Sequence, residues 1–358
     1  MKVLYLINHA GKGGSEKYVE SLAKGLIDTG NVPYLAYNEE GPLVLNMKAL
    51  GIKCFHISMN HPLDIIAAKK LSYLCKKLNV DIVHSQFPRE NYIALLANIF
   101  FNNVNVIYTS HINLKNNFMW KITNYFLTRK NSAIIAVCGS VKGLLIKNRY
   151  PSSKIKVIFN GVQLEENINL NANKNKVFIF TTLARLSPEK GLLFLLQSAE
   201  LLANEGVKFK LYIAGDGPQL AELNYFILSK QLNNCIKLLG YVDETKSLLF
   251  ESDAYINCSE SEALSFAILE AMNCGLPIIA TKVGGNIEII QQSNCGILVD
   301  YNNAKEMAKA MKTLINNPTV CKKYSNNSRV GVQSVFNTKE MFSQTYRLYK
   351  SAGGSNVN

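Results

Sequence analysis

One local pattern occurs twice in this chain, and it restricts the possible folds more than any other feature. An apolar run rich in strand formers at 2–8 leads into a glycine-bearing turn at 9–15 and then into a helical stripe of apolar residues. Residues 176–183, 184–191 and 192–203 repeat this order of strand, turn and helix. Because further strands and helices alternate after each copy, we predict an α/β protein with two Rossmann-like, doubly wound domains.

The remaining strands follow from apolar runs of three to six residues bounded by turn residues. An Asn-rich stretch of mixed charge at 163–175 separates the two halves, and 358 residues suit about two domains. The predicted strands are 2–8, 32–37, 52–57, 80–84, 104–109 and 133–137 in the first half, and 176–183, 209–214, 235–239, 254–257, 277–281 and 297–299 in the second.

The cysteines and the apolar runs indicate the compartment. The closest two of the eight cysteines are 16 residues apart, so neither a C-x-x-C motif nor a zinc spacing occurs. No run of 18 apolar residues exists, and the apolar start breaks too early for a signal peptide. We therefore expect reduced cysteines and a cytoplasmic protein without a membrane span.

The positive charge is concentrated in the first half. The chain has a net charge of +13, of which residues 1–165 carry +11. Residues 91–164 contain nine Lys or Arg and no acid. Two interpretations remain open: a basic surface that keeps the protein in solution, or a face that meets anionic lipid, nucleic acid or a phosphorylated substrate.

Two cations flank the turn that opens the second half. Arg185 comes just after the strand at 176–183, and Lys190 follows five residues later. A guanidinium fork and an ammonium group are well suited to hold a diphosphate. The alternative is a pair of solvated charges on a loop.

Two glutamates stand eight residues apart at 262 and 270, with an apolar helical pattern between and around them. A carboxylate embedded in such a run, as at Glu270, needs a hydroxyl or a cation as partner. Glu262 has a simpler alternative, because Ser259-x-x-Glu262 matches a capping box that would start a helix.

Other candidates lie where strands end. Gly13 and Gly14 precede a predicted helix, whose N-terminal N–H groups could bind an anion, although G-x-G-x-x-G is not matched and a turn without a ligand fits equally well. Gly284-Gly285-Asn286 is a similar turn. His111 comes just after the strand predicted at 104–109. It therefore lies at the carboxyl edge of the first sheet, and open α/β sheets bind ligands at such an edge.

Taken together, three motifs resemble those of the retaining family 4 glycosyltransferases of the GT-B fold. They are Arg185…Lys190, Glu262-x7-Glu270-Ala-Met-x-x-Gly-x-Pro and Gly284-Gly-x-x-Glu288-Ile-Ile. The resemblance implies two Rossmann-like domains facing a cleft, with residues 1–165 binding the acceptor and residues 166–335 the nucleotide-sugar. It also implies a helix at 336–350 that crosses back to the N-terminal domain, and transfer of a sugar to a glycan or lipid-linked acceptor in polysaccharide or glycolipid synthesis.

The resemblance assigns roles to the candidate residues. Arg185 and Lys190 would hold the donor diphosphate, Glu270 the ribose hydroxyls and Glu262 the hydroxyls of the transferred sugar. His111 would face the reacting sugar. Backbone groups near the phosphates and the sugar would come from Gly13, Gly14, Leu264, Ser265 and Phe266.

Some positions depart from the family pattern, and the nucleotide, sugar and acceptor stay open. Ala263-Leu264-Ser265 replaces the more usual Gly-Phe-Gly or Gly-Phe-Pro, and Gln86 stands where a histidine is common. None of the seven aspartates form Asp-x-Asp. We therefore expect no metal or other cofactor, with Arg185 and Lys190 neutralising the diphosphate.

Residues 114–130 combine helical spacing of apolar and aromatic side chains, including the only Trp, with four cations. A basic, aromatic, amphipathic helix can lie on a membrane, which favours a lipid-linked acceptor and a peripheral position on the inner membrane face. The alternative is an ordinary helix packed on the sheet. Phe118 and Trp120 are the residues expected at the membrane interface, with Lys115, Lys121, Arg129 and Lys130 around them.

Two rival functions share parts of this pattern. A nucleotide-sugar epimerase would bind the same donor without an acceptor. A basic module binding nucleic acid would need aromatic residues on an exposed sheet face, whereas the predicted strands are buried, so no nucleic acid is expected.

Overall fold

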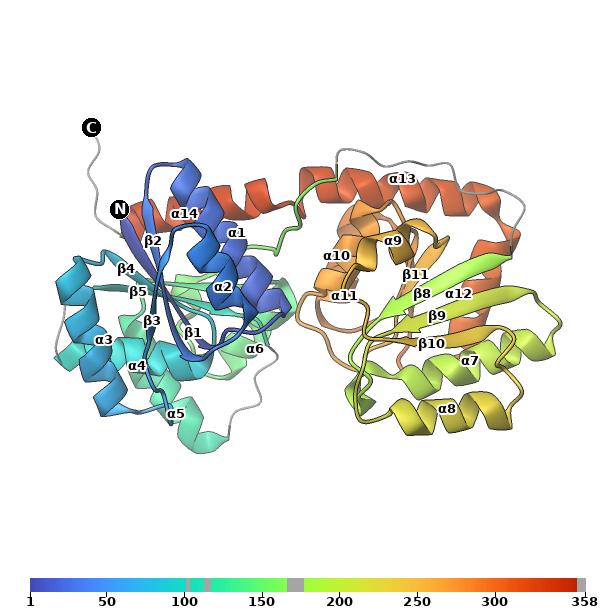
Figure 1. The fold of residues 1–358 in the computed structure, drawn as a ribbon, viewed down its shortest axis with the longest axis horizontal. Coiled ribbons are helices and arrows are strands. Elements are labelled where there is room, and N and C mark those ends of the chain that lie inside the picture. The colour runs from blue at the N-terminus through green and yellow to red at the C-terminus, as the bar shows by residue number, and fades with distance from the viewer. Residues whose placement is uncertain (101–103, 113–116, 166–176, 353–358) are drawn as a thin grey trace. The chain divides into compact units, whose positions relative to one another are not determined.

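The computed structural model describes residues 1–100, 104–112, 117–165 and 177–352. The chain divides into two compact units, Met1–Gly161 together with Thr338–Asn358, and Val162–Asn337. Each unit has its own parallel sheet with helices on both faces (Figure 1). The predicted α/β fold with two Rossmann-like sheets is confirmed.

The first unit contains a seven-stranded sheet in the order β3-β2-β1-β4-β5-β6-β7, and every pair is parallel. Its middle strands are apolar because helices bury them on both sides. The strands are β1 (Lys2–His9), β2 (Val32–Glu39), β3 (Lys53–His56), β4 (Ile82–Ser85), β5 (Asn105–Ser110), β6 (Ala133–Ala136) and β7 (Ile155–Val157).

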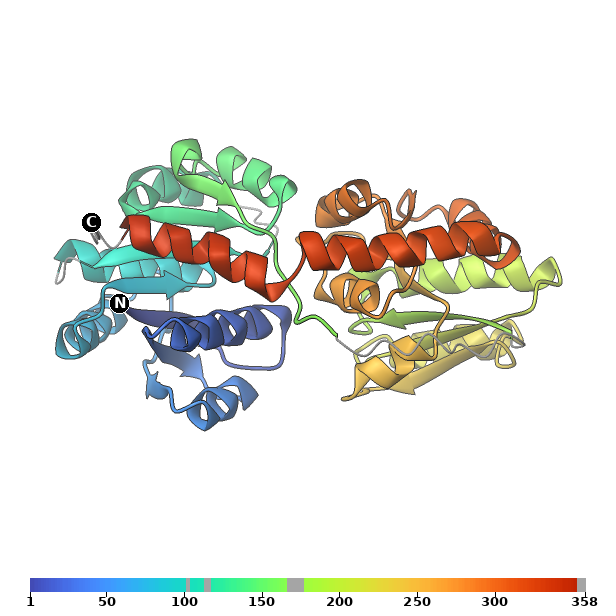
Figure 2. The same cartoon turned by 90° about the horizontal axis from the view of Figure 1, so that it is seen from above.

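The helices of the first unit form two groups. Helix α1 contacts α2 and α14, whereas α3 contacts α4 on the other face. Figure 2 shows α14 alongside α1. The helices are α1 (Gly14–Asp28), α2 (Pro42–Ala49), α3 (Ile65–Leu78), α4 (Pro88–Phe100), α5 (Phe118–Leu127), α6 (Gly139–Lys147) and α14 (Thr338–Ala352), with single 3-10 turns at Thr128–Lys130 and Ser152–Lys154.

The second unit repeats this design around six parallel strands in the order β10-β9-β8-β11-β12-β13. Its strands are β8 (Phe178–Leu183), β9 (Phe209–Ala214), β10 (Ile236–Gly240), β11 (Ala254–Asn257), β12 (Ile278–Thr281) and β13 (Gly296–Val299). Its helices are α7 (Leu192–Asn204), α8 (Leu220–Ser229), α9 (Thr245–Phe250), α10 (Phe266–Asn273), α11 (Gly284–Ser293), α12 (Ala304–Asn316) and α13 (Pro318–Ser334), with a 3-10 turn at Pro188–Lys190.

Helix α14 completes the first unit although it follows the whole second unit in the chain. Gly25 of α1 lies directly against the ring of Phe342. The hydroxyl of Tyr349 lies 2.5 Å from Nδ1 of His84, which is fully buried in β4. A buried polar contact of this kind ties α14 to the centre of the sheet.

The described residues include no helix that is both long and apolar enough to cross a membrane. None of the eight cysteines, all of which lie among the described residues, forms a disulfide, and five of them are buried. The five buried cysteines act as small apolar side chains in the interior.

Candidate functional site

The loop after β8 carries Arg185 and Lys190, and the neighbouring loop after β9 holds it in place. The N–H of Leu186 donates to the carbonyl of Asp216 at 2.9 Å. Gly215 has φ of 146°, and a Cβ at this position would lie 1.8 Å from the carbonyl oxygen of Ala184. Only glycine allows the two loops to approach so closely.

Lys190 and Glu262 meet at the carboxyl edge of the sheet. Nζ of Lys190 lies 2.7 Å from Oε1 of Glu262, and both side chains are largely shielded from solvent. The two residues follow β8 and β11, which are neighbours in the strand order. Because the connections turn in opposite directions from these two strands, this is the point where doubly wound sheets bind ligands.

Glu262 also accepts from Ser259, whose Oγ lies 2.7 Å from the same carboxylate oxygen. The capping-box interpretation of this pair is therefore wrong, because the helix begins at Phe266 and not after Ser259. Ser265 is the residue that caps α10, and its side chain accepts from the N–H of Ile268. The segment 258–265 is a loop, which frees Glu262 to reach Lys190.

Two asparagines support this loop; Asn257 was not among the sequence candidates, and Asn286 was named only as part of the glycine turn at 284–286. Asn257 ends β11, and its Nδ2 lies 3.4 Å from Oε1 of Glu262. Its Oδ1 accepts from Nδ2 of Asn286 at 3.0 Å. An asparagine at the end of a buried strand, facing a Gly-Gly-Asn turn, was the available sequence signal.

The turn that begins α11 packs against the backbone of the loop at 258–265. Gly284 has φ of 45°, and a Cβ there would lie 1.7 Å from the carbonyl oxygen of Glu262. The N–H of Gly285 donates to the carbonyl of Ala263 at 2.9 Å. Backbone contacts therefore set the position of Glu262.

The other second-unit candidates occupy different surroundings. Arg185 is exposed. Its backbone carbonyl accepts from the N–H of Ser187 at 2.9 Å, but within the described residues its side chain makes no hydrogen bond or ion pair. Glu270 lies half-buried on α10, one helical turn beyond Phe266. The start of α10 directs backbone N–H groups outward near Glu262. That segment contains Leu264, Ser265 and Phe266, of which the first two are buried.

In the first unit, His111 follows β5 and contacts Gln86, which follows β4. Nε2 of His111 lies 3.0 Å from Oε1 of Gln86, and Nε2 of Gln86 donates to the carbonyl of His84 at 3.1 Å. Because that carbonyl can only accept, the Gln86 oxygen must face His111 and the histidine must carry its proton on Nε2. Burial lowers the pKa of His111 to about 3, so the ring is neutral at pH 7.

Gly13 and Gly14 begin α1 close to this histidine. Gly13 is the N-cap residue of the helix and has no side chain to satisfy the first N–H groups. Tyr18, one turn into α1, packs edge-on against His111 with ring centroids 4.8 Å apart. The N-terminus of α1 and His111 thus lie at the same edge of the first sheet.

The candidates therefore form two groups. Gly13, Gly14 and His111 belong to the first unit, and the arginine, the lysine, the two glutamates and 264–266 belong to the second. Among the residues that the structure describes, no cluster of three or more His, Cys, Asp or Glu could hold a metal ion.

Comparisons with known proteins match both halves of the chain to glycosyltransferases. A family model described as "Glycosyl transferases group 1" matches residues 164–330, and one described as "Glycosyltransferase Family 4" matches residues 12–166. A UDP-Gal:alpha-D-GlcNAc-diphosphoundecaprenol alpha-1,3-galactosyltransferase from Escherichia coli is 27% identical over 307 residues, which cover 80% of this chain and 79% of that protein.

Two solved structures share the fold over nearly the full length of both chains. A glycosyltransferase from Rickettsia africae ESF-5 has a TM-score of 0.86 and 25% identity, covering 99% of each chain. HepE from Anabaena, solved in complex with UDP, has a TM-score of 0.85 and 20% identity, covering 98% of this chain and all of that one.

Proposed function

Because the chain belongs to the group 1 and family 4 glycosyltransferases of the GT-B fold, a family of retaining enzymes, we propose a specific form of that activity for it. The enzyme transfers a hexose from a nucleotide-diphosphate-sugar to a glycan or a lipid-linked acceptor. The bond between the anomeric carbon and the diphosphate breaks, and the acceptor hydroxyl forms the new bond with the configuration retained. The hydroxyl proton is lost to the released diphosphate or to solvent.

The observation that carries the proposal is the Lys190–Glu262 pair at the switch point of the second sheet. Lys190 has three N–H donors, so contact with Glu262 leaves capacity to bind a diphosphate oxygen. Arg185 is exposed on the same rigid loop and supplies a second cation. Both charges stabilise the developing negative charge of the leaving nucleotide.

The two glutamates serve the hydroxyl groups of the donor. Glu262 binds the transferred sugar, which its backbone-locked position supports. Glu270 binds the ribose, and the N–H groups of Leu264, Ser265 and Phe266 lie against the phosphates. The N-terminus of α10 adds a favourable dipole for these anionic groups.

The first unit contributes contacts to the sugar and the phosphates. His111 is held as a neutral ring with its proton directed at Gln86, which leaves Nδ1 as an acceptor for a sugar hydroxyl. Gly13 and Gly14, at the N-terminus of α1, bind the diphosphate through backbone N–H groups. Transfer needs no metal, because Arg185 and Lys190 neutralise the diphosphate.

Of the two acceptor classes, the charge of the first half supports a lipid-linked one, with the enzyme working as a cytoplasmic protein at the inner membrane face. The Escherichia coli relative is named for a diphosphoundecaprenol acceptor. The first half carries +11 of the net +13 charge, and each Lys or Arg near an anionic bilayer contributes about 1 kcal/mol.

The test is a thermal-shift screen of UDP, GDP and their sugars, followed by product analysis with and without acceptor. A ligand at a hundred times its Kd stabilises the folded state by about 2.7 kcal/mol, which is a clear rise in Tm. We expect one nucleotide class to raise the Tm of the wild type and to do so less for Lys190→Ala. No response to any nucleotide, or sugar conversion that needs no acceptor, would contradict the proposal.

A further inference from the structure

Helix α5 of the first unit presents most of its apolar side chains to solvent. Only Asn124 of its ten residues is buried. A helix packed normally on a sheet buries its apolar stripe, so this face lacks a partner within the described chain. The exposed fractions are 76% for Phe118, 73% for Met119, 44% for Ile122, 41% for Tyr125 and 67% for Phe126.

Two sequence expectations for this segment need revision. The helix was predicted over 114–130 but begins at Phe118, and Leu114 and Lys115 lie outside the described residues. Trp120 does not face outward with Phe118. It stacks on the buried ring of Tyr92 with centroids 5.2 Å apart and an interplanar angle of 14°, and therefore anchors α5 to the unit.

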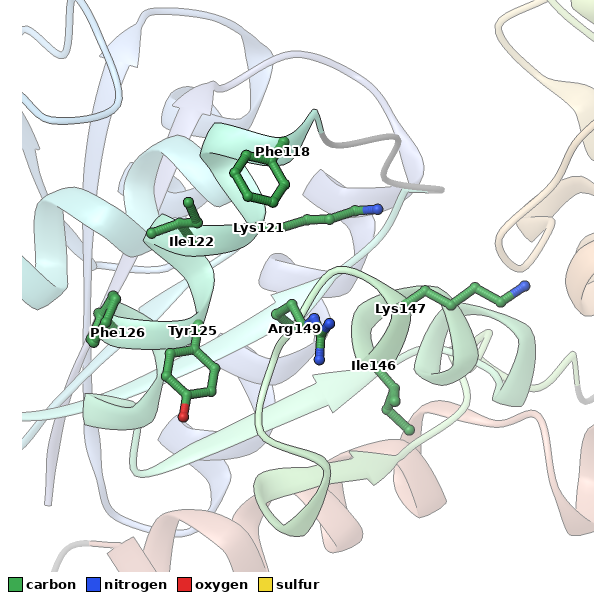
Figure 3. Close-up of a pocket in the computed structure, with 8 residues that line it drawn as sticks. All are labelled: Phe118, Lys121, Ile122, Tyr125, Phe126, Ile146, Lys147 and Arg149. Carbon is green, nitrogen blue, oxygen red and sulfur yellow. The ribbon is translucent and has the colours of Figure 1, made fainter.

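Beside the exposed face lies a hollow of about 580 Å³, a size typical of ligand pockets. Figure 3 shows α5 on one side of it, with the end of α6 and the residues after it on the other. We call it the α5–α6 hollow, and it is lined by Phe118, Lys121, Ile122, Tyr125, Phe126, Ile146, Lys147 and Arg149.

The charges around the hollow are of one sign. Its three charged lining residues are Lys121, Lys147 and Arg149, and no acid occurs anywhere in residues 91–164. None of the three forms an ion pair within the described chain. In the view of Figure 3, Lys121 and Lys147 extend to the same side, and the guanidinium of Arg149 lies between the helices.

Arg149 has a backbone conformation that is unfavourable for arginine. Its φ of 68° lies in the left-handed region, which favours glycine or asparagine after a helix. The N–H of Tyr150 returns to the carbonyl of Leu145 and closes the end of α6. Glycine would adopt this φ at lower cost than arginine does.

We propose that the α5–α6 hollow seats one apolar chain of a membrane lipid whose phosphate headgroup is held by Lys121, Lys147 and Arg149. The occupant must join an apolar part to an anionic part, because the lining is apolar and the charges beside it are all positive. Arginine and lysine are the usual partners of phosphate, and the arginine can bind two of its oxygens at once. The inference rests on the proposed function only in placing the enzyme at a bilayer.

The first experiment separates the chain from the headgroup with a single-chain probe. Dodecyl phosphate is titrated into the full-length protein below its micelle concentration, with inorganic phosphate and dodecyl maltoside titrated in parallel. We expect dodecyl phosphate to bind at least tenfold more tightly than either. Equal binding of inorganic phosphate, or equal binding of the uncharged maltoside, would overturn the proposal.

The second experiment asks whether the hollow itself is the seat. Ile146→Trp places a ring inside the hollow, and Met119→Trp places the same ring on the exposed helix face outside the lining. Both variants add apolar surface, but only the first fills the space for a chain. We expect Ile146→Trp to weaken dodecyl phosphate at least tenfold and Met119→Trp to leave it unchanged. Unweakened binding by Ile146→Trp would sink the proposal.

The third experiment tests the three cations on a bilayer. Vesicles of phosphatidylcholine and phosphatidylglycerol (3:1) are co-sedimented with the triple variant Lys121→Ser, Lys147→Ser and Arg149→Gly. About fivefold per cation gives an expected loss of roughly a hundredfold at low salt. The control is a variant of equal charge change on α3, where Lys69, Lys70 and Lys77 are exposed and replaced by Ser.

The control variant should lose much less than the hollow variant. An equal loss for both would show that net charge alone drives binding and would refute a specific headgroup site. None of these measurements uses the donor. The nucleotide-induced rise in Tm is expected to stay unchanged in every variant, so failure here is distinguishable from failure of the proposed transfer reaction.

Discussion

The two units share one architecture but hold their candidate side chains in different ways. In the second unit, Glu262 is set by backbone contacts, because Gly284 and Gly285 pack directly on the carbonyls of the loop. In the first unit, His111 is set by a side chain, because Gln86 fixes both its orientation and its proton. A site locked through the backbone tolerates no added atom, whereas a site locked through hydrogen bonds changes gradually with substitution and with pH.

The largest effect is expected from a substitution that disrupts the backbone packing around Glu262. Gly284→Ala should lower the free energy of unfolding by about 3 kcal/mol or more and abolish transfer, because its Cβ overlaps the carbonyl of Glu262. Gly206→Ala is the matched control, since its φ is also positive at 72° and nothing lies within 4 Å. It should lose only about 1–2 kcal/mol in urea unfolding. Equal losses would show that conformation alone, and not contact, matters at Gly284.

A buried carboxyl in the first unit should respond to pH. Glu90 is fully buried, and burial raises its pKa to about 7, while Oε1 accepts from the N–H of Asn8. The unfolded carboxyl ionises near pH 4.5, so stability falls as pH rises from about 4.5 to 7, by roughly 3 kcal/mol in total.

Glu90→Gln removes this pH-dependent cost and keeps the acceptor for Asn8. Its Tm should exceed that of the wild type at pH 8, and the advantage should shrink as the pH approaches 4.5. A difference in Tm that is constant across this range would contradict the raised pKa.

Removing donor contacts should affect transfer without affecting folding. Lys190→Ala and Glu270→Ala each lose a charge-assisted hydrogen bond to the donor, worth roughly 1.5–3 kcal/mol, or about 10- to 100-fold in kcat/KM. Lys208→Ala is the control, because this lysine is exposed on the same unit. If a purified, folded Lys190 or Glu270 variant were fully active, the assignment of the donor site would be wrong.

Removing the hydrogen bond between Gln86 and His111 in the first unit should have a smaller effect on transfer. Gln86→Leu removes the acceptor that keeps the proton of His111 on Nε2, so ¹⁵N NMR should show a mixture of the two neutral tautomers. We expect kcat to fall about fivefold, in line with one neutral hydrogen bond. A single unchanged tautomer in the variant would mean that Gln86 does not orient His111.

The last prediction is that removing metal ions has no effect on transfer. Transfer should be unchanged by EDTA and should give a product with retained configuration at the anomeric carbon by NMR. The basis is the pair of cations Arg185 and Lys190 together with the lack of Asp-x-Asp in the sequence. Activity that EDTA removes and manganese restores would contradict this, as would an inverted product.

The sequence predicted the strands well because buried parallel strands read as short apolar runs. Every predicted strand is present, and β7 was missed because it has three residues at a sheet edge. The Glu262 loop was misread as part of a helix, since its apolar residues follow helical spacing until Ser265 caps α10. Asn257 and its hydrogen bond to Asn286 escaped detection because that contact spans 29 residues. The α5–α6 hollow escaped for the same reason, because α5 and Arg149 meet only in the folded unit.

The place of α14 has a consequence for the order in which a ribosome delivers this fold. The strands of the first sheet are complete at Val157, but α14, which packs on α1 and meets His84, is made about 180 residues later. At 5–20 residues per second, roughly 10–35 s pass before it emerges. During that time the second unit can fold from a continuous stretch of chain. In the first unit, the face of α1 that α14 later covers stays exposed. The unit whose synthesis begins first is therefore the last to be finished, and nascent chains stalled before Thr338 are expected to be the ones that chaperones bind.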